Sequence, residues 1–240
     1  MDKLNVNTIE PEGGTTTLNV GISGKNVTIT DNLKANTLKD AGGNTIFTSD
    51  GSGNLSSVNS GFGSAQVLLS TQTASGSASV EFTSGIDGTY KEYVFDFTSM
   101  YSSVDGGEIN FQVSTDGGSS YGVTATTTVF QALHTESDSV AALTYQAAKD
   151  LAQSTSDQKF FYDVGNAADM GSGGILHLFN PASTTYVKNF YAEGSLAASQ
   201  PGARNAFIAG YFNTTSALDA IIFRPASGTI SGKIKMYGMK

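Results

Sequence analysis

Hydrophobic and polar residues alternate most clearly in the middle of the chain, between residues 89 and 130. In TYKEYVFDFTSM, the aromatic residues Tyr93, Phe95 and Phe97 are each separated by one residue, and EINFQVS repeats this period of two. Such a period is typical of β-strands with one buried and one solvated face. Asp-Gly-Gly at 105–107 and again at 116–118 provides residues that tight turns favour. We therefore predict three consecutive strands of one antiparallel meander, with the aromatic face in a core and the polar face in water.

Apolar segments recur at about ten-residue intervals through much of the remaining chain. Those predicted as strands are 66–75, 77–84, 159–164, 174–179, 185–193, 205–212, 219–224 and 229–239. Many short strands in this rhythm favour an all-β fold, a β-sandwich or a jelly roll. Residues 132–158 lose the alternation and are expected to form a loop with one short element. A helix at 140–151 and a strand at 143–147 both fit that stretch.

The first 61 residues carry a different pattern, in which apolar islands such as LNV, TLNV and NVTI alternate with GG, SG and DN. So few apolar side chains in a single copy do not offset the conformational entropy of ordering the segment. We predict that residues 1–61 form an intertwined trimeric β-shaft that folds only between chains, followed by a head domain at 62–240. A flexible, partly ordered tail is the alternative interpretation.

The composition limits the partners of the chain. It has 240 residues, no Cys, no Trp and a formal net charge of −8. Without cysteine there are no disulfides and no thiolate metal sites. An acidic chain repels phosphate backbones, so nucleic acid is not an expected partner. No apolar run approaches the roughly 18 residues of a membrane span, and membrane insertion is not expected.

One short motif is assigned to a turn. Ser114, Asp116, Gly118 and Tyr121 fit the pattern S-x-D-x-G-x-x-aromatic, the Asp box of many β-hairpins. The Asp carboxylate of such a turn accepts hydrogen bonds from nearby backbone amides. A single copy is expected to be structural.

No catalytic, cofactor or metal site is expected. The two histidines, His134 and His177, fall in different predicted elements, and no nucleophile motif such as G-x-S-x-G accompanies them. The carboxylates are numerous but lack the D-x-D-x-D-G spacing of a calcium loop. We therefore do not expect an enzyme.

Several stretches resemble a known family. GILHLFNPASTTYVKNF at 174–190 and the run from AFIAGYF at 206–212 to the C-terminus resemble the jelly-roll heads of fibre and adhesin proteins from tailed bacteriophages, particularly those of marine and cyanobacterial hosts. GGTTTLNVGISGKNVTITDNL at 13–33 is similar to the β-structured shafts of such fibres. The resemblance implies a homotrimeric virion protein, made in the host cytoplasm.

That resemblance leaves three functions open. The chain is expected to be a tail fibre that binds a host-surface receptor, most simply a glycan, and attaches to other virion proteins through its N-terminal segment. A capsid-decorating or head-fibre protein has the same features. A polysaccharide-degrading tailspike is the third and weakest interpretation, since depolymerases build their grooves on much longer solenoids.

Receptor contact is predicted on the loops of the head, because loops vary without disturbing a core. The segments chosen are 131–173, the longest part without alternation, and the turn at 101–107. Tyrosine rings can stack on sugars and carboxylates can accept hydrogen bonds from sugar hydroxyls. The candidate receptor-binding residues are Tyr101, Asp105, Asp138, Tyr145 and Asp169, whereas Tyr162 is expected to be buried in the core.

Overall fold

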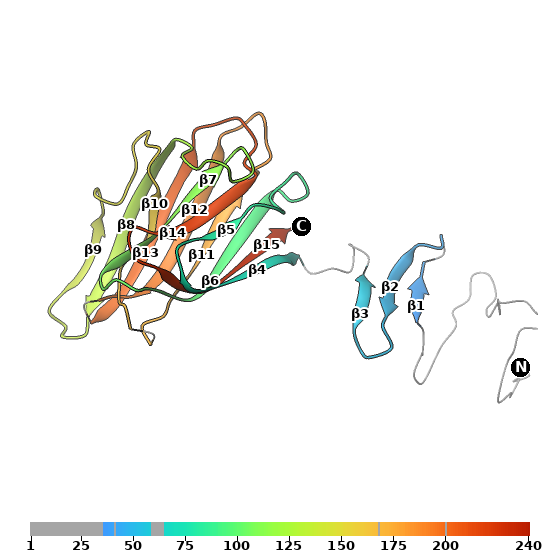
Figure 1. Ribbon diagram of the computed structural model, residues 1–240, viewed down its shortest axis with the longest axis horizontal. Coiled ribbons are helices and arrows are strands. Elements are labelled where there is room, and N and C mark those ends of the chain that lie inside the picture. Colours follow the sequence, from blue (N-terminus) through green and yellow to red (C-terminus); the bar gives the residue numbers. More distant parts are fainter. Residues whose placement is uncertain (1–35, 41, 59–64, 168, 200) are drawn as a thin grey trace, which may run out of the picture. The chain divides into compact units, whose positions relative to one another are not determined.

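The computed structural model describes residues 36–40, 42–58, 65–167, 169–199 and 201–240, and every regular element within these residues is a β-strand (Figure 1). The chain divides into two compact units, Met1–Phe62 and Gly63–Lys240. The prediction of an all-β protein is confirmed. The larger part of the predicted shaft, residues 1–35, lies outside the described residues, and its folding between chains stays a prediction.

The described part of the first unit is a small antiparallel sheet of β1 (Thr37–Lys39), β2 (Thr45–Ser49) and β3 (Leu55–Val58), in that order. The two turns between its strands share one design. In the first, Asp40 accepts hydrogen bonds from the backbone N–H and the side-chain amide of Asn44, at 2.8 and 3.0 Å. Asp50 and Asn54 repeat both bonds at 3.1 and 2.8 Å. The Gly- and Asn-rich links at 40–44 and 50–54 are thus tight turns closed by an Asp–Asn pair.

The second unit contains twelve strands in two antiparallel sheets. They are β4 (Gln66–Ser77), β5 (Val80–Phe82), β6 (Glu92–Ser102), β7 (Gly107–Ser114), β8 (Ala125–Thr135), β9 (Ala141–Tyr145), β10 (Gln158–Val164), β11 (Ser172–Phe179), β12 (Lys188–Ala197), β13 (Gly202–Phe212), β14 (Ala220–Pro225) and β15 (Ile230–Met239). The eight-stranded sheet has the order β4-β15-β6-β11-β12-β13-β8-β9, and the four-stranded sheet has the order β10-β7-β14-β5. Each segment predicted as a strand in this unit overlaps one of these strands.

The two sheets enclose one core that is rich in phenylalanine. The ring of Phe97 in the large sheet lies 5.0 Å from the rings of both Phe160 and Phe223 in the small sheet. Phe111 in the small sheet lies 5.3 Å from Phe190 in the large one, nearly perpendicular to it. Edge-to-face pairs of this kind add to the stabilisation from buried apolar area. Phe111 is fully buried, as the alternation predicted.

The predicted central meander is wrong. The strands β6, β7 and β8 do not pair with one another: β6 pairs with β15 and β11, β7 pairs with β10 and β14, and β8 pairs with β13 and β9. The turn at 103–106 therefore carries the chain from one sheet to the other instead of closing a hairpin. Both strands keep their aromatic residues toward the core, because each sheet presents its apolar face to the other. Local alternation is the same in either arrangement.

The polar face of β7 is also buried, contrary to the expected solvated face. Gln112 is only 1% exposed, and its side-chain amide donates to the backbone oxygens of Thr155 and Ser156 at 3.2 and 3.0 Å. The segment before β10 thus covers β7, and backbone acceptors satisfy the buried amide.

The stretch 132–158 is less irregular than predicted. Strand β8 continues to Thr135, and β9 follows after a short turn. The short element is therefore a strand, and the helical alternative at 140–151 is wrong.

Close packing requires glycine at one point of the large sheet. Gly174 of β11 pairs with Gly194 of β12, and the rings of Phe160 and Phe161 rest on this position. A Cβ on Gly174 would lie 2.6 Å from the carbonyl oxygen of Glu193 and 3.2 Å from the Phe160 ring. The paired glycines let the small sheet approach the large one.

The second unit has two distinct ends. Both of its termini lie at one end, where Lys240 N–H donates to Ala65 O at 2.9 Å. At the opposite end, Ser103 N–H donates to Thr229 O and Glu136 N–H donates to Pro201 O. We call this second group of connections the loop end; it consists of residues 103–106, 136–140, 165–167, 169–171, 198–199, 201 and 226–229.

Candidate ligand-binding face

The structure brings three of the five predicted receptor residues to the loop end of the second unit. Asp105 lies in the turn between β6 and β7, Asp138 in the turn between β8 and β9, and Asp169 in the connection between β10 and β11; all three are exposed. Asp138 Oδ1 lies 2.9 Å from His134 Nε2 at the surface. Within the described residues, no group of three His, Asp or Glu side chains is arranged to hold a metal ion.

The two predicted tyrosines lie elsewhere. Tyr101 is in β6, half-buried beside a shallow hollow that Lys233 also lines. Tyr145 is the last residue of β9, on the outer face of the large sheet. Its hydroxyl donates to Asp150, and this hydrogen bond is the main reason why the pKa of Tyr145 is raised. The five residues therefore do not form a single site. Tyr162 is fully buried, as expected.

The Asp-box turn lies at the end where the chain termini meet. Asp116 accepts hydrogen bonds from the hydroxyl of Ser114 at 2.6 Å and from the backbone N–H and hydroxyl of Ser120. These bonds, the one from Ser114 first, lower the pKa of Asp116 to about 2. Tyr121 lies beside Gly118 and donates to Glu81 at 3.1 Å. Burial, followed by the charge of Glu81, raises the pKa of Tyr121 to about 12. The geometry is that of a self-contained turn.

A feature that the sequence reasoning missed lies on the outer face of the large sheet, the face turned away from the core. The rings of Phe130 (β8) and Phe207 (β13) stack there at 4.8 Å with 12° between their planes. Next to them, Tyr191 of β12 stacks on His177 of β11 at 4.4 Å and 13°. Phe130 and Tyr191 are 40% and 41% exposed. Rings held flat and exposed on a rigid sheet are suited to contact with a ligand.

Three hollows follow β13 along this face, between β8 and β12. The first, of about 370 Å³, is lined by Thr128, Asn189, Ala209 and Tyr211 among others. The second hollow, of about 310 Å³, is also lined by Thr128 and Ala209, together with the aromatic rings of Phe130, Tyr191 and Phe207. The third, of about 240 Å³, lies further along β13 at Asn205 and Ala203. We call this row the β13 groove. Its residues are Thr126–Thr128, Phe130, Ala132–His134, Asn189–Glu193, Ser195, Ala203–Asn205 and Phe207–Tyr211.

Hydrogen bonds fix the side chains along the groove. At one end, the Gln153 amide donates to Thr126 at 2.7 Å and to the hydroxyl of Tyr211 at 3.5 Å. In the middle, Asn205 donates to Glu193 at 3.0 Å. Beside the groove, His177 Nδ1 lies 2.5 Å from Glu92 Oε1, which holds the imidazole against Tyr191. A groove with side chains fixed in this way loses little conformational freedom on binding.

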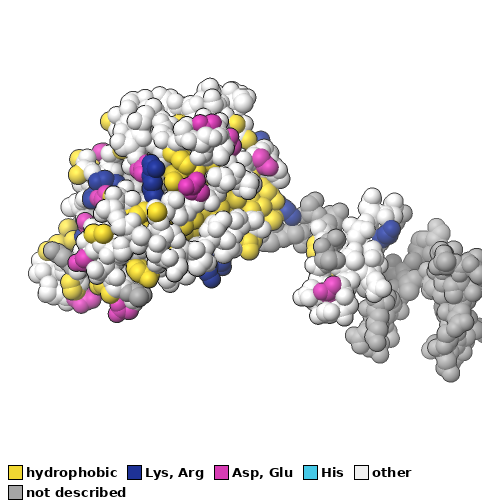
Figure 2. Space-filling model, viewed as in Figure 1, with side chains coloured by type: hydrophobic (Ala, Val, Ile, Leu, Met, Phe, Trp, Pro, Cys, Tyr) yellow, Lys and Arg dark blue, Asp and Glu magenta, His cyan; other side chains and the backbone are white. Residues whose placement is uncertain are grey.

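Charged groups are sparse in the β13 groove. Glu193 is its one carboxylate. Arg204 borders the last hollow, but its guanidinium points to the opposite face of the sheet, where it donates to Asp163 of β10 at 2.6 Å. The face of the molecule drawn in Figure 2 shows charged side chains scattered among hydrophobic and other side chains. The groove therefore offers apolar rings and neutral hydrogen-bonding groups.

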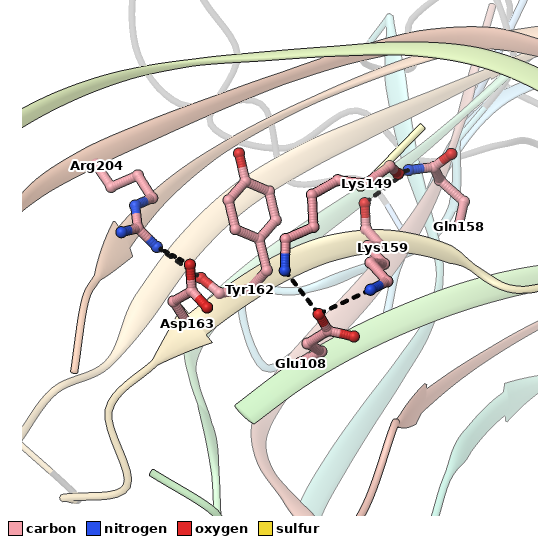
Figure 3. Close-up of polar contacts among 7 residues, drawn as sticks. All are labelled: Glu108, Lys149, Gln158, Lys159, Tyr162, Asp163 and Arg204. Carbon is pink, nitrogen blue, oxygen red and sulfur yellow. Dashed lines mark hydrogen bonds and ion pairs between the residues drawn. The ribbon is translucent and has the colours of Figure 1, made fainter. Parts of the chain in front are cut away.

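A second group of polar residues, around Glu108, has a structural role. Glu108 of β7 accepts from Lys149 at 2.8 Å and from Lys159 at 3.0 Å (Figure 3). Burial favours a raised pKa for Glu108, but the hydrogen bonds from the two lysines outweigh it and the pKa is lowered. The ring of Tyr162 lies between the side chains of Lys149 and Arg204, at 5.1 and 5.7 Å. This network fastens the segment before β10 to the small sheet.

One signal in the sequence pointed to the groove. In NAFIAGYF, apolar residues occupy both odd and even positions of the strand. Phe207 and Tyr211 therefore lie on the face opposite to Ile208 and Phe212. A strand with apolar residues on both faces is either covered on both faces or presents aromatic rings to a ligand. That Phe130 and Tyr191 join Phe207 could not be deduced, because the pairing of β8, β12 and β13 is set by the tertiary fold.

Comparison with known proteins gave no match of any kind: no family model fits the chain, and neither a curated protein nor a solved structure is similar to it. Within the described residues there is no helix long and apolar enough to cross a membrane.

Proposed function

We propose that this chain is a structural protein of a bacteriophage virion, a tail fibre whose second unit contacts a glycan on the host-cell surface. The observation that carries the proposal is the β13 groove, an exposed row of rings and neutral polar groups on a rigid sheet. Both termini of this unit lie at the end opposite to the loop end. Attachment at the terminus end of this unit would leave its loop end accessible. The resemblance of 174–190 and 206–240 to phage fibre heads supports the same reading.

The proposal includes a homotrimer with an intertwined N-terminal shaft. In the small sheet of the first unit, Leu55 and Val58 are 55% and 44% exposed in the single chain. Apolar residues that one copy leaves uncovered are covered when copies assemble. The head is proposed to be of jelly-roll type, since successive strands of the second unit repeatedly change sheet. The N-terminal segment would bind another virion protein.

Binding without turnover is proposed. The two histidines have carboxylate neighbours, Asp138 for His134 and Glu92 for His177, and they lie on strands β8 and β11, which are not adjacent. Neither a tailspike nor any other enzyme is favoured by this arrangement. A capsid-decorating protein shares the proposed shaft and head, but it does not require an exposed binding groove.

The experiment is adsorption of the fluorescently labelled full-length protein to a panel of bacterial strains, including cyanobacteria, in low and high salt. We expect adsorption to a few strains only, and little weakening by salt, because an acidic protein is not drawn to an anionic envelope by long-range attraction. Pre-incubation with the protein should also block infection of those strains by the parent phage. We expect antibody labelling of phage particles to place the protein on the tail. Exclusive capsid labelling together with no adsorption to any strain would overturn the proposal in favour of decoration.

A further inference from the structure

We propose that the β13 groove binds an elongated, uncharged glycan that lies along β13. This inference rests on the proposed function and names the site and the ligand class within it. Three properties of the groove lead to it: its length, its stacked rings and its lack of free positive charge.

The length of the groove fits a chain rather than a single sugar. It follows β13 from Tyr211 to Ala203, eight residue steps of roughly 3.3 Å, or about 26 Å. The first two hollows are continuous because both are lined by Thr128 and Ala209. Among the outward positions of β13, Ala209 keeps the floor low where the first two hollows join, and Ala203 does so in the last hollow; the ring of Phe207 stands between them. A ligand with repeating units can occupy consecutive hollows.

The rings supply the contact that uncharged sugars need. Tyr191 and Phe130 border the middle hollow, each about two-fifths exposed. A pyranose ring has C–H groups on its faces and hydroxyls around its rim, so it lies flat on an aromatic ring while its hydroxyls stay free to bond. Here the stack of Tyr191 on His177 and that of Phe130 on Phe207 hold both rings in place before any ligand arrives.

The polar groups of the groove disfavour negatively charged ligands. Neutral amides and hydroxyls from Asn189, Asn205, Thr128 and Tyr211 line it, and Glu193 can accept from two sugar hydroxyls. An anionic sugar would meet the Glu193 carboxylate without a basic residue to offset it, since the Arg204 side chain points away from the groove, toward Asp163 on the other face of the sheet. For the same reason the groove does not suit nucleic acid, whose recognition requires clustered Lys and Arg.

The test uses the full-length protein and immobilised maltohexaose, cellohexaose and chitohexaose, with hexagalacturonic acid as the anionic counterpart. We expect at least one neutral hexamer to retain the protein, with retention rising from the dimer to the hexamer, and no retention on hexagalacturonic acid. Tyr191→Ala should weaken binding about five- to tenfold through loss of stacking. Ala209→Leu, which fills the junction of two hollows, should weaken binding to the hexamer more than to the dimer.

The matched control is Leu68→Ala, which removes an exposed apolar side chain from β4, on the opposite edge of the same sheet. It should bind as the unchanged protein does. Circular dichroism melting of each variant checks its folding. No retention on any neutral hexamer, stronger retention on hexagalacturonic acid, or equal binding by all three variants would overturn the inference. A change of oligomeric state in Tyr191→Ala and Ala209→Leu would instead identify the groove as a contact between copies and would overturn it too.

Cell adsorption of the groove variants distinguishes a wrong assignment of the glycan site from a wrong proposed function. If the unchanged protein adsorbs to cells and both groove variants adsorb equally well, the receptor site lies elsewhere, with the loop end as the next location. If it binds a neutral hexamer but adsorbs to no cells, the groove is a glycan site on a protein that is not an adhesin.

Discussion

Phe130 and Phe207 stack almost parallel on the outer face of the eight-stranded sheet, with 4.8 Å between ring centroids and 12° between planes. The two residues are direct cross-strand partners of β8 and β13. Cross-strand aromatic pairs stabilise the register of neighbouring strands. This pair also forms the step between the middle and last hollows of the β13 groove, so one contact serves both the sheet and the candidate site.

The core depends on Phe111, which is fully buried and lies near the rings of Phe190, Phe212 and Phe223. We expect Phe111→Ala to lower the free energy of unfolding by about 3 to 5 kcal/mol, because the sheets cannot close over the cavity. Urea denaturation followed by circular dichroism measures it. The control Leu68→Ala should change it by less than about 0.5 kcal/mol. Equal losses in the two variants would contradict the assigned core.

The turn at Asp116 should make stability depend on acid pH. Its folded pKa of about 2 lies below the roughly 3.9 of an unfolded Asp. A carboxyl with a depressed folded pKa contributes stability that is fully present above about pH 4 and is lost as pH falls toward 2. Asp116→Asn should therefore melt at a lower temperature than the unchanged protein at pH 6. The difference in melting temperature between the two proteins should become smaller between pH 4 and pH 2. A difference that does not change with pH would contradict the assigned hydrogen bonds.

The network at Glu108 gives a second acid-sensitive contact. Glu108→Gln removes the carboxylate that accepts from Lys149 and Lys159, and it should lower the free energy of unfolding by about 1 to 3 kcal/mol. Because the pKa of Glu108 is lowered in the folded state, its contribution is present above about pH 4.5 and is lost as pH falls below that. Denaturation of both proteins at pH 7 and pH 3 tests whether Glu108→Gln destabilises the protein less at pH 3 than at pH 7. A larger effect at pH 3 than at pH 7 would contradict it.

The oligomeric state follows from the proposed shaft. Three copies of the 24.9 kDa chain should give a particle of about 75 kDa by light scattering. If the first unit folds only between chains, dilution that separates the copies should also remove its share of the β-sheet circular dichroism signal. A monodisperse 25 kDa species at micromolar concentration would exclude the trimer.

The strands of the second unit could be predicted because alternation is a local property of the sequence. Tyr93, Phe95 and Phe97 face one way in any antiparallel arrangement, and their burial follows from hydrophobicity alone. The turn at Asp116 is equally local, since its partners Ser114 and Ser120 lie within four residues.

Only the tertiary structure decided which strands are neighbours. A period of two does not distinguish a hairpin from a chain that crosses between sheets, so β6 and β7 were placed together when they belong to opposite layers. The same limit applies to Gln112, whose burial depends on a segment more than forty residues away. It applies most to the β13 groove, because Phe130, Tyr191 and Phe207 come together only through long-range pairing. The sequence determined that these residues lie on strands, and the pairing of the strands determined that they share one surface.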